Sequence, residues 1–220
     1  MIWVAYLDVR GLDIARCRPH VSPQRWEKAG GYLQENDRKL SLGAELLLNH
    51  GLEILAPDRS RPAQYHRDAK GKPLLTGSHL HFSLSHSGAF AACALSSAPV
   101  GVDIEQMAEI DLALAKRFFH PEETARILGN DDPVDSFYQH WTLKESYLKC
   151  LGTGLSLPLH AFCVDPGADP PRITHNGETL PFALRTWQLE GYRLAVCCQA
   201  DAMEPQCAPR QTDIRDCLRP

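Results

Sequence analysis

One stretch of the sequence, FYQHWTLKESYLKCL at residues 137–151, has the spacing of an amphipathic helix. Phe137, Trp141 and Leu148 fall on one face, which predicts the buried side of this helix. Glu145 lies on the same stripe, and a carboxylate without a partner is unfavourable away from water. The chain must therefore adopt a fold in which Glu145 is paired, bound to a cation or facing a cleft.

Lys149 follows Glu145 by one turn, about 6 Å away across the helix surface, so an acid and a base share a short patch. An ordinary i,i+4 ion pair at the edge of the apolar stripe explains this patch as well as a binding site does. The helix alone leaves both interpretations open.

A second acidic pair lies upstream, in the segment VGVDIE. Asp103 and Glu105 are two residues apart on an expected strand, so both carboxylates leave the same face, while Val102 and Ile104 point into the core. Two like charges side by side repel each other unless a cation or a base neutralises them. A solvent-facing strand end is the alternative for this pair taken alone.

Together the two patches supply the ligands of a divalent-metal site. Asp103, Glu105 and Glu145 offer three carboxylates and leave positions for water and substrate, which is how Mg²⁺ is usually held at phosphate chemistry. Lys149 would then act as a point charge on a phosphate oxygen. The combination predicts a divalent metal and a phosphoryl substrate.

The order of expected elements recurs after Ala98. In both parts a strand precedes a short helix, a long helix and further strands. The expected first part has a strand at the N-terminus, a helix beginning at Ser22-Pro23, a helix over 36–49 that ends at His50-Gly51, loops over 56–79 and a hairpin over 79–97. The expected second part has a strand over 99–105, helices over 111–119, 121–128 and 135–151, and strands over 161–164, 182–189 and 192–199. We expect an α+β fold of two pseudo-symmetric halves packed side by side, residues 1–98 and 99–200, followed by a loosely packed tail at 201–220.

Composition excludes several classes of protein. The net charge of −4 argues against general nucleic-acid binding, which relies on a basic surface. No run of about 18 apolar residues predicts a membrane span, and the N-terminus lacks the basic region of a secretory signal. The eight cysteines contain no C-x-x-C motif and lie mostly in apolar surroundings, so we expect reduced thiols in a cytoplasmic protein.

The chain resembles a known family at these same residues. GVDIE at 101–105, followed some 40 residues later by WTLKESYLK at 141–149, is similar to the signature pair of the 4′-phosphopantetheinyl transferases. The resemblance is to the larger, monomeric surfactin-type class, and FSLSHSG at 82–88, GKP at 71–73 and LGTGLSLPL after the long helix also match it in kind and order. It covers most of residues 20–200, and the conjunction of motifs is far more specific than either motif alone.

The resemblance implies a fold of two pseudo-symmetric halves with coenzyme A in the cleft between them. By resemblance, Asp103, Glu105 and Glu145 hold Mg²⁺, or Mn²⁺ in its place, on the coenzyme A pyrophosphate. A serine hydroxyl of an apo carrier protein attacks the phosphorus attached to pantetheine, and 3′,5′-ADP departs. Glu145, directly or through a metal-bound water, is the expected general base, and Lys149 is expected to stabilise charge on the transferring phosphoryl group.

Residues of the first half also match family positions. Ser85 and His86 correspond to positions that touch the 3′-phosphate region of coenzyme A. Arg25, Lys28 and Lys72 fall where the family places further phosphate or adenine contacts. One chain then contains both sides of the cleft, so the resemblance implies a monomer.

Two rival functions remain open. A non-catalytic module that binds coenzyme A or a carrier would keep the fold, although mere binding would not need a base. A metal-dependent phosphohydrolase would use water in place of serine. A zinc cluster at His79, His81 and His86 is not expected, because no further Cys or His follows at ligand spacing.

Overall fold

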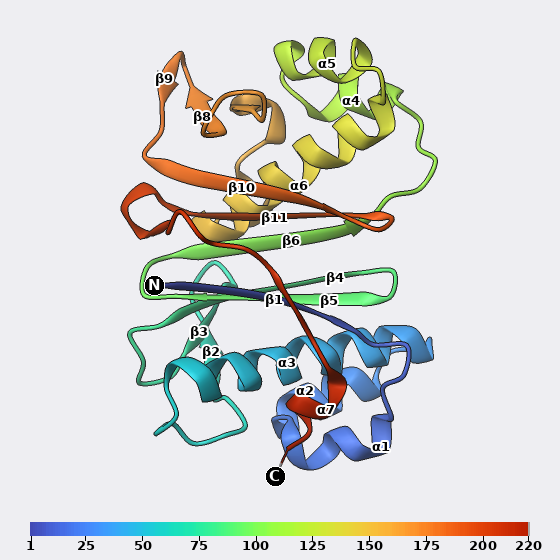
Figure 1. The fold of residues 1–220 in the computed structure, drawn as a ribbon, viewed down its shortest axis with the longest axis vertical. Helices are drawn as coiled ribbons and strands as arrows, with labels where there is room; N and C mark the ends of the chain where they lie inside the picture. The colour runs from blue at the N-terminus through green and yellow to red at the C-terminus, as the bar shows by residue number, and fades with distance from the viewer. Residues whose placement is uncertain (220) are drawn as a thin grey trace.

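The computed structural model describes residues 1–219, apart from the side chain of Leu155, and has the expected mixed α+β fold. Two stacked sheets lie at the centre of the molecule, with helices covering the outer face of each (Figure 1). The first sheet has the order β12-β1-β5-β4, formed by Arg210–Thr212, Ile2–Asp8, Phe90–Ser96 and His81–Ser87. The second sheet has the order β10-β11-β6, formed by Phe182–Leu189, Tyr192–Gln199 and Val100–Gln106.

The helices and the short strands surround these sheets. On the side of the first sheet lie α1 (Ile14–Cys17), α2 (Pro23–Gly30), α3 (Glu35–Leu55) and α7 (Ile214–Cys217), with the hairpin of β2 (Tyr65–Arg67) and β3 (Pro73–Leu75). On the side of the second sheet lie α4 (Ala113–Phe118), α5 (Pro121–Leu128), α6 (Pro133–Leu151) and the small sheet of β7 (Cys163–Asp165), β8 (Arg172–His175) and β9 (Glu178–Thr179). Within residues 1–219 no helix is both long enough and apolar enough to cross a membrane.

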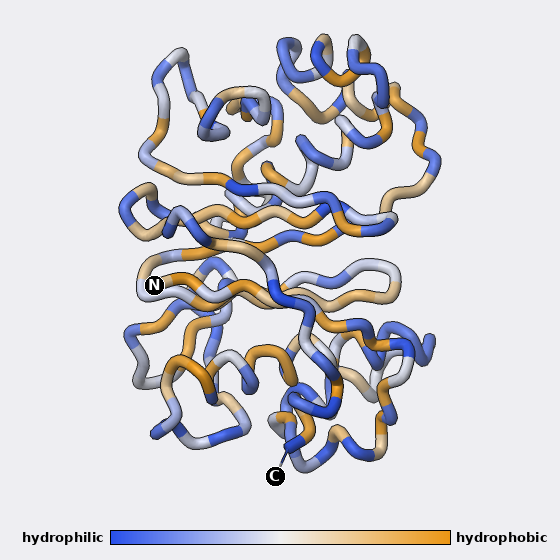
Figure 2. Tube along the Cα trace, viewed as in Figure 1, coloured by the Kyte–Doolittle hydropathy of each residue, from blue (hydrophilic) through white to orange (hydrophobic). Residues whose placement is uncertain are grey.

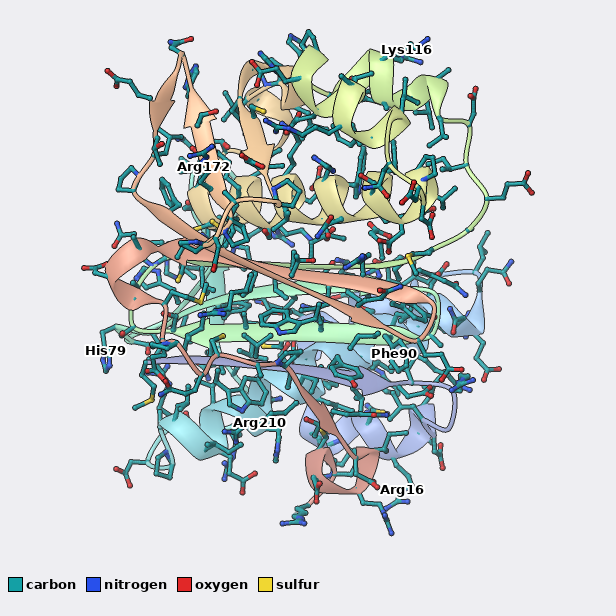
Figure 3. The ribbon with its side chains drawn as sticks, turned by 45° about the horizontal axis from the view of Figure 1, so that its top comes forward. Arg16, His79, Phe90, Lys116, Arg172 and Arg210 are labelled. Atoms are coloured by element: carbon teal, nitrogen blue, oxygen red, sulfur yellow. The ribbon has the colours of Figure 1, made fainter. Side chains whose placement is uncertain are left out.

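Alternation along the strands builds three layers of core. On β1, Trp3 and Leu7 face α3, whereas Ile2 and Val4 point between the two sheets. Figure 2 shows hydrophobic residues along the strands of both sheets. Phe90, labelled in Figure 3, joins the sheets by packing edge-on against Tyr192 of β11, with ring centroids 4.6 Å apart.

Serine hydroxyls connect β4 to β6 where the two sheets meet. Oγ of Ser83, Ser85 and Ser87 accepts from the backbone N–H of Val102, Ile104 and Gln106, at 3.1, 3.4 and 3.1 Å respectively. Along HFSLSHS, every second residue from Ser83 is therefore a serine that faces the neighbouring strand. These bonds satisfy donors on the edge of β6 without a shared β-ladder.

Gly101 allows α6 to lie directly against β6. A Cβ at this position would overlap the carbonyl oxygen of Ser146 and come within 2.5 Å of the Cys150 backbone nitrogen, both in the helix backbone. Because Asp103 and Glu105 follow on the same face of β6, this close approach brings both carboxyls next to α6.

We therefore expect Gly101→Ala to lower the free energy of unfolding by about 3 kcal/mol, because the clash is with backbone that cannot move cheaply. Urea denaturation would measure the change. Gly30→Ala is the matched control, since a Cβ at Gly30 meets nothing within 4 Å. Equal stability of the two variants would show that α6 can shift away from β6 without penalty.

His140, on α6, gives stability a defined pH dependence. Its Nδ1 donates to the Ser136 carbonyl at 2.8 Å, its Nε2 is buried without a partner, and the ring is 2% exposed. Burial is the main cause that lowers the pKa of His140 from 6.5 to about 4. Lys144 and Arg126 act in the same direction, while the Ser136 carbonyl and Asp165 oppose the shift.

Between pH 6.5 and 4 the unfolded chain therefore binds a proton at this histidine that the folded protein does not bind. Stability should fall as the pH drops through this window, by up to about 3 kcal/mol from this one group. Urea denaturation at pH 7, 5 and 4.5 would measure it, with His140→Gln as the comparison. Identical pH profiles for the two proteins would contradict the assignment.

Two expectations about the fold are wrong. The helix expected to end at His50-Gly51 continues to Leu55. Gly51 is not a helix stop but allows α3 to pack closely against β1, because a Cβ at this position would lie 2.6 Å from the Trp3 ring. The segment 201–220 is not a loosely packed tail throughout. Strand β12 pairs in parallel with β1, and Cys217 of α7 is buried in the core beside α3, so apolar side chains anchor this segment.

Candidate active site

The carboxyl groups of β6 face α6, as the alternation of VGVDIE predicts. Asp103 is 2% exposed, and its Oδ1 accepts from Lys149 Nζ at 2.6 Å and from Ser85 Oγ at 2.8 Å. Lys149 Nζ also donates to Ser85 Oγ at 2.9 Å. The ion pair of Lys149 thus crosses to β6 and is not the i,i+4 pair with Glu145. This triangle joins β4, β6 and α6 at one point.

Unbalanced negative charge remains around Asp103. Burial, followed by the neighbouring charge of Asp103, raises the pKa of Glu105 to about 7. Burial also raises the pKa of Glu145, and Asp103 again adds to the effect, while Lys149 opposes it at both groups. Oδ2 of Asp103 is buried without a hydrogen-bond partner. One lysine is therefore too little positive charge for three acids.

This donor set fits a hard divalent cation. Carboxylate oxygens are the ligands that Mg²⁺ prefers, and a cation would give the Asp103 Oδ2 atom the partner that it lacks. The expected convergence is incomplete, however. Asp103, Glu105 and Glu145 do not bring one oxygen each within 4.8 Å of one another, and Lys149 occupies a position against Asp103.

A cavity of about 350 Å³ opens beside these groups. Its walls come from α2, α3, the β2–β3 hairpin, β4 and α6, so both the first and the second part of the chain contribute. Six basic side chains line it against a single acid, Glu145: Arg25, Lys28, Arg67, Lys70, Lys72 and Lys149. On a chain with a net charge of −4, this concentration of positive charge indicates a site for a polyanion.

Two of the expected phosphate contacts already have partners in the protein. Arg25 donates from Nε to the buried Glu45 at 3.0 Å and from Nη2 to the Tyr65 hydroxyl at 3.0 Å. Lys72 donates from Nζ to the Cys150 carbonyl at the end of α6, at 2.6 Å. These bonds fix the position of both cations, and Lys72 also connects the β2–β3 hairpin to α6.

The side chains of Ser85 and His86 point to opposite faces of β4, because they are adjacent residues of one strand. Ser85 contacts Asp103 and Lys149, whereas His86 lines the cavity. Burial, followed by the charge of Lys149, lowers the pKa of His86. The imidazole is therefore suited to hydrogen bonding with a ligand more than to supplying charge.

The structure adds three residues that sequence reasoning missed. Arg67 and Lys70 lie on the β2–β3 hairpin and line the cavity; the only signal was the basic composition of the segment around GKP. Lys144, next to Glu145, is fully buried, and its Nζ lies 2.9 Å from Glu123 and 2.8 Å from the Leu159 carbonyl. Lys144 thus fixes the position of α6 from the side opposite the cavity.

Comparisons with known proteins show which family the chain is similar to. The family model of the 4′-phosphopantetheinyl transferase superfamily matches residues 99–197, which contain Asp103, Glu145 and Lys149. The 4′-phosphopantetheinyl transferase gsp of Aneurinibacillus migulanus is 32% identical over 181 residues, covering 81% of this chain and 76% of that protein. The 4′-phosphopantetheinyl transferase Sfp of Bacillus subtilis (strain 168) is 32% identical over 189 residues, covering 80% and 81% respectively.

Among solved structures, the holo-acyl-carrier-protein synthase of Thermotoga maritima covers 46% of this chain and 62% of its own, at 18% identity and a TM-score of 0.41. The sequence relatives are far more similar and extend over most of both chains. The chain therefore belongs to the 4′-phosphopantetheinyl transferase family, in the class of Sfp and gsp.

Proposed function

We propose that this transferase moves 4′-phosphopantetheine from coenzyme A to a serine hydroxyl of an apo carrier protein and releases 3′,5′-ADP. The observation that carries the proposal is the basic cavity that reaches Glu145 and Lys149, with the buried Asp103 directly behind them. Coenzyme A carries a 3′-phosphate and a diphosphate, and a cavity with six cations and one acid suits such a ligand.

The basic residues of the cavity divide into two groups, according to whether protein partners already hold their charged groups. Arg25 and Lys72 are held by protein partners and present fixed positive charge. Lys28 and Lys70, which line the same cavity, are the candidates for direct contact with phosphate oxygens. Arg67 donates from Nη1 to the Gly71 carbonyl at 2.6 Å and keeps its other guanidinium donors for a ligand. His86, which lines the cavity, contributes a hydrogen-bonding group to the ligand, whereas Ser85 holds Asp103 and Lys149 in place.

Asp103, Glu105 and Glu145 would hold the metal. When bound, Mg²⁺ or Mn²⁺ would neutralise charge on the diphosphate of coenzyme A. Lys149 then acts on the transferring phosphoryl group as a fixed point charge, which is the main requirement of a loose phosphoryl-transfer transition state.

Glu145 is the group that removes the proton from the carrier serine. A serine hydroxyl is a poor nucleophile until a base accepts its proton, and a base is most effective when its pKa approaches the working pH. Burial raises the pKa of Glu145 in that direction, and the residue lines the cavity. A binding module without catalysis has no need of such a group.

We further infer that residues 1–98 and 99–200 are two related halves. The order of the strands supports this inference. In the first part β1 pairs with β5, and β5 pairs with β4; in the second part β6 pairs with β11, and β11 pairs with β10. All four pairings are antiparallel. The cavity takes walls from both parts, so one chain supplies a whole site and a monomer suffices.

Incubation with coenzyme A and Mg²⁺, with and without an apo carrier protein, tests the function. We expect the carrier to gain the mass of one phosphopantetheine and 3′,5′-ADP to appear only when the carrier is present. Release of 3′,5′-ADP without a carrier would support a phosphohydrolase. Binding of coenzyme A with neither product would support a non-catalytic module.

A further inference from the structure

A second group of metal-ligating side chains lies outside the active-site cavity. His120 and Glu122 stand at the beginning of α5, and Cys163 begins β7. One ligand atom from each of the three side chains lies within 4.8 Å of the others. None of the three lines the basic cavity. This convergence joins two segments that are distant in the sequence.

The three side chains face a common space. They line a cavity of about 230 Å³, which His160 and Asn176 also line. Cys163 is 7% exposed, so its thiol is reached through this cavity and not from an open surface. A cavity with an imidazole, a carboxylate and a thiol on its walls, and a second imidazole beside them, has the composition of a metal site.

Glu123 holds the two segments in register. Its carboxylate is fully buried and accepts from the His120 backbone N–H at 2.9 Å and from the Val164 backbone N–H at 2.6 Å. Val164 follows Cys163 directly, so one carboxylate fixes the backbone beside two of the candidate ligands. Lys144 holds Glu123 in turn, at 2.9 Å. The arrangement is thus built by the fold and does not depend on flexible surface side chains.

Arg126 lies beside two of the candidate ligands. Its Nη1 lies 3.7 Å from Cys163 Sγ, and its Nη2 lies 3.8 Å from Glu122 Oε2. Both contacts are long and partly exposed, so they are weak and a metal ion can replace them.

We propose that His120, Glu122 and Cys163 form a zinc-binding site, with the fourth position taken by water or by His160. One nitrogen, one oxygen and one sulfur ligand are a combination that Zn²⁺ accepts and that Mg²⁺ and Ca²⁺, which prefer oxygen ligands alone, do not. Because α5 and β7 would then be joined through the metal, the site would stabilise the part of the fold that supports α6.

Titration of the metal-free, full-length protein with Co²⁺ tests this site, because a thiolate bound to Co²⁺ gives a charge-transfer absorption band. We expect a band at one equivalent of Co²⁺ that Zn²⁺ removes by displacement. Cys163→Ser should abolish the band, and His120→Asn should weaken Co²⁺ binding by at least about tenfold. Asn keeps a side chain able to cap α5, as His120 does when its Nδ1 accepts from the Glu122 backbone N–H at 3.3 Å. Cys207→Ser is the matched control, because Cys207 is a half-buried thiol elsewhere in the chain.

Thermal denaturation provides a second readout that does not depend on transfer activity. Zn²⁺ should raise the Tm of the wild type and of Cys207→Ser, and should leave the Tm of Cys163→Ser and His120→Asn unchanged. Absence of a band at one equivalent, or a band that persists in Cys163→Ser, would overturn the proposal. If Cys163→Ser does not fold, His120→Asn provides the test, because the His120 side chain is partly exposed and its replacement disturbs the core less. An unweakened band in His120→Asn would then overturn the proposal equally.

Discussion

Glu145→Gln should reduce phosphopantetheine transfer by about 10²- to 10⁴-fold, the contribution expected of a general base. The substitution keeps the shape of the side chain and its ability to hydrogen-bond, but it removes the proton acceptor. Glu145 lines the cavity beside Lys149, and burial has already moved its pKa towards neutrality. Mass spectrometry of the carrier protein, sampled over time, measures the loss.

Two measurements separate this role from others. The variant should keep its Tm and its binding of coenzyme A, because the cations of the cavity are unchanged. Raising the Mg²⁺ concentration should not restore the rate, whereas restoration would make Glu145 mainly a metal ligand. Glu178→Gln, an exposed glutamate on β9, is the matched control and should transfer normally. Near-normal turnover of Glu145→Gln would remove Glu145 from catalysis.

The parts of the site that the sequence could predict depend on local geometry. Alternation along a strand places Asp103 and Glu105 on one face and separates Ser85 from His86, and both effects need only neighbouring residues. The helix beginning at Ser22-Pro23 is equally local, since the Ser22 side chain caps the helix that carries Arg25 and Lys28.

The parts that could not be predicted depend on contacts between distant segments. The apolar stripe of α6 gave no sign that Lys144 would be fully buried, because its partner Glu123 lies on another helix. Arg67 and Lys70 reach the cavity through a short hairpin whose position is set by tertiary packing. Gly51 has the form of a helix stop, but it is needed for close packing against Trp3 and Leu95.

Asp103→Ala should raise the Mg²⁺ concentration needed for half-maximal transfer by about 10- to 100-fold. Asp103 is the central acid of the site: its charge raises the pKa of both Glu105 and Glu145, and its Oδ2 is buried without a partner. A cation bound to Oδ2 of Asp103 would lose its most buried ligand in the variant. Transfer rates measured across a Mg²⁺ titration give the shift directly.

Asp103 also holds Lys149, at 2.6 Å, so the two roles must be separated. Lys149→Met removes the same ion pair but leaves the carboxylate in place. If Asp103 only positions Lys149, the two variants should share one Mg²⁺ titration curve, with lower rates throughout. If Asp103 is a ligand, Asp103→Ala should shift the titration curve to higher Mg²⁺ concentrations. Lys149→Met should shift the curve to lower Mg²⁺ concentrations or leave it unchanged, because the positive charge that competes with the metal is removed. An unchanged titration in Asp103→Ala would exclude Asp103 as a ligand, and with it the three-carboxylate site proposed between β6 and α6.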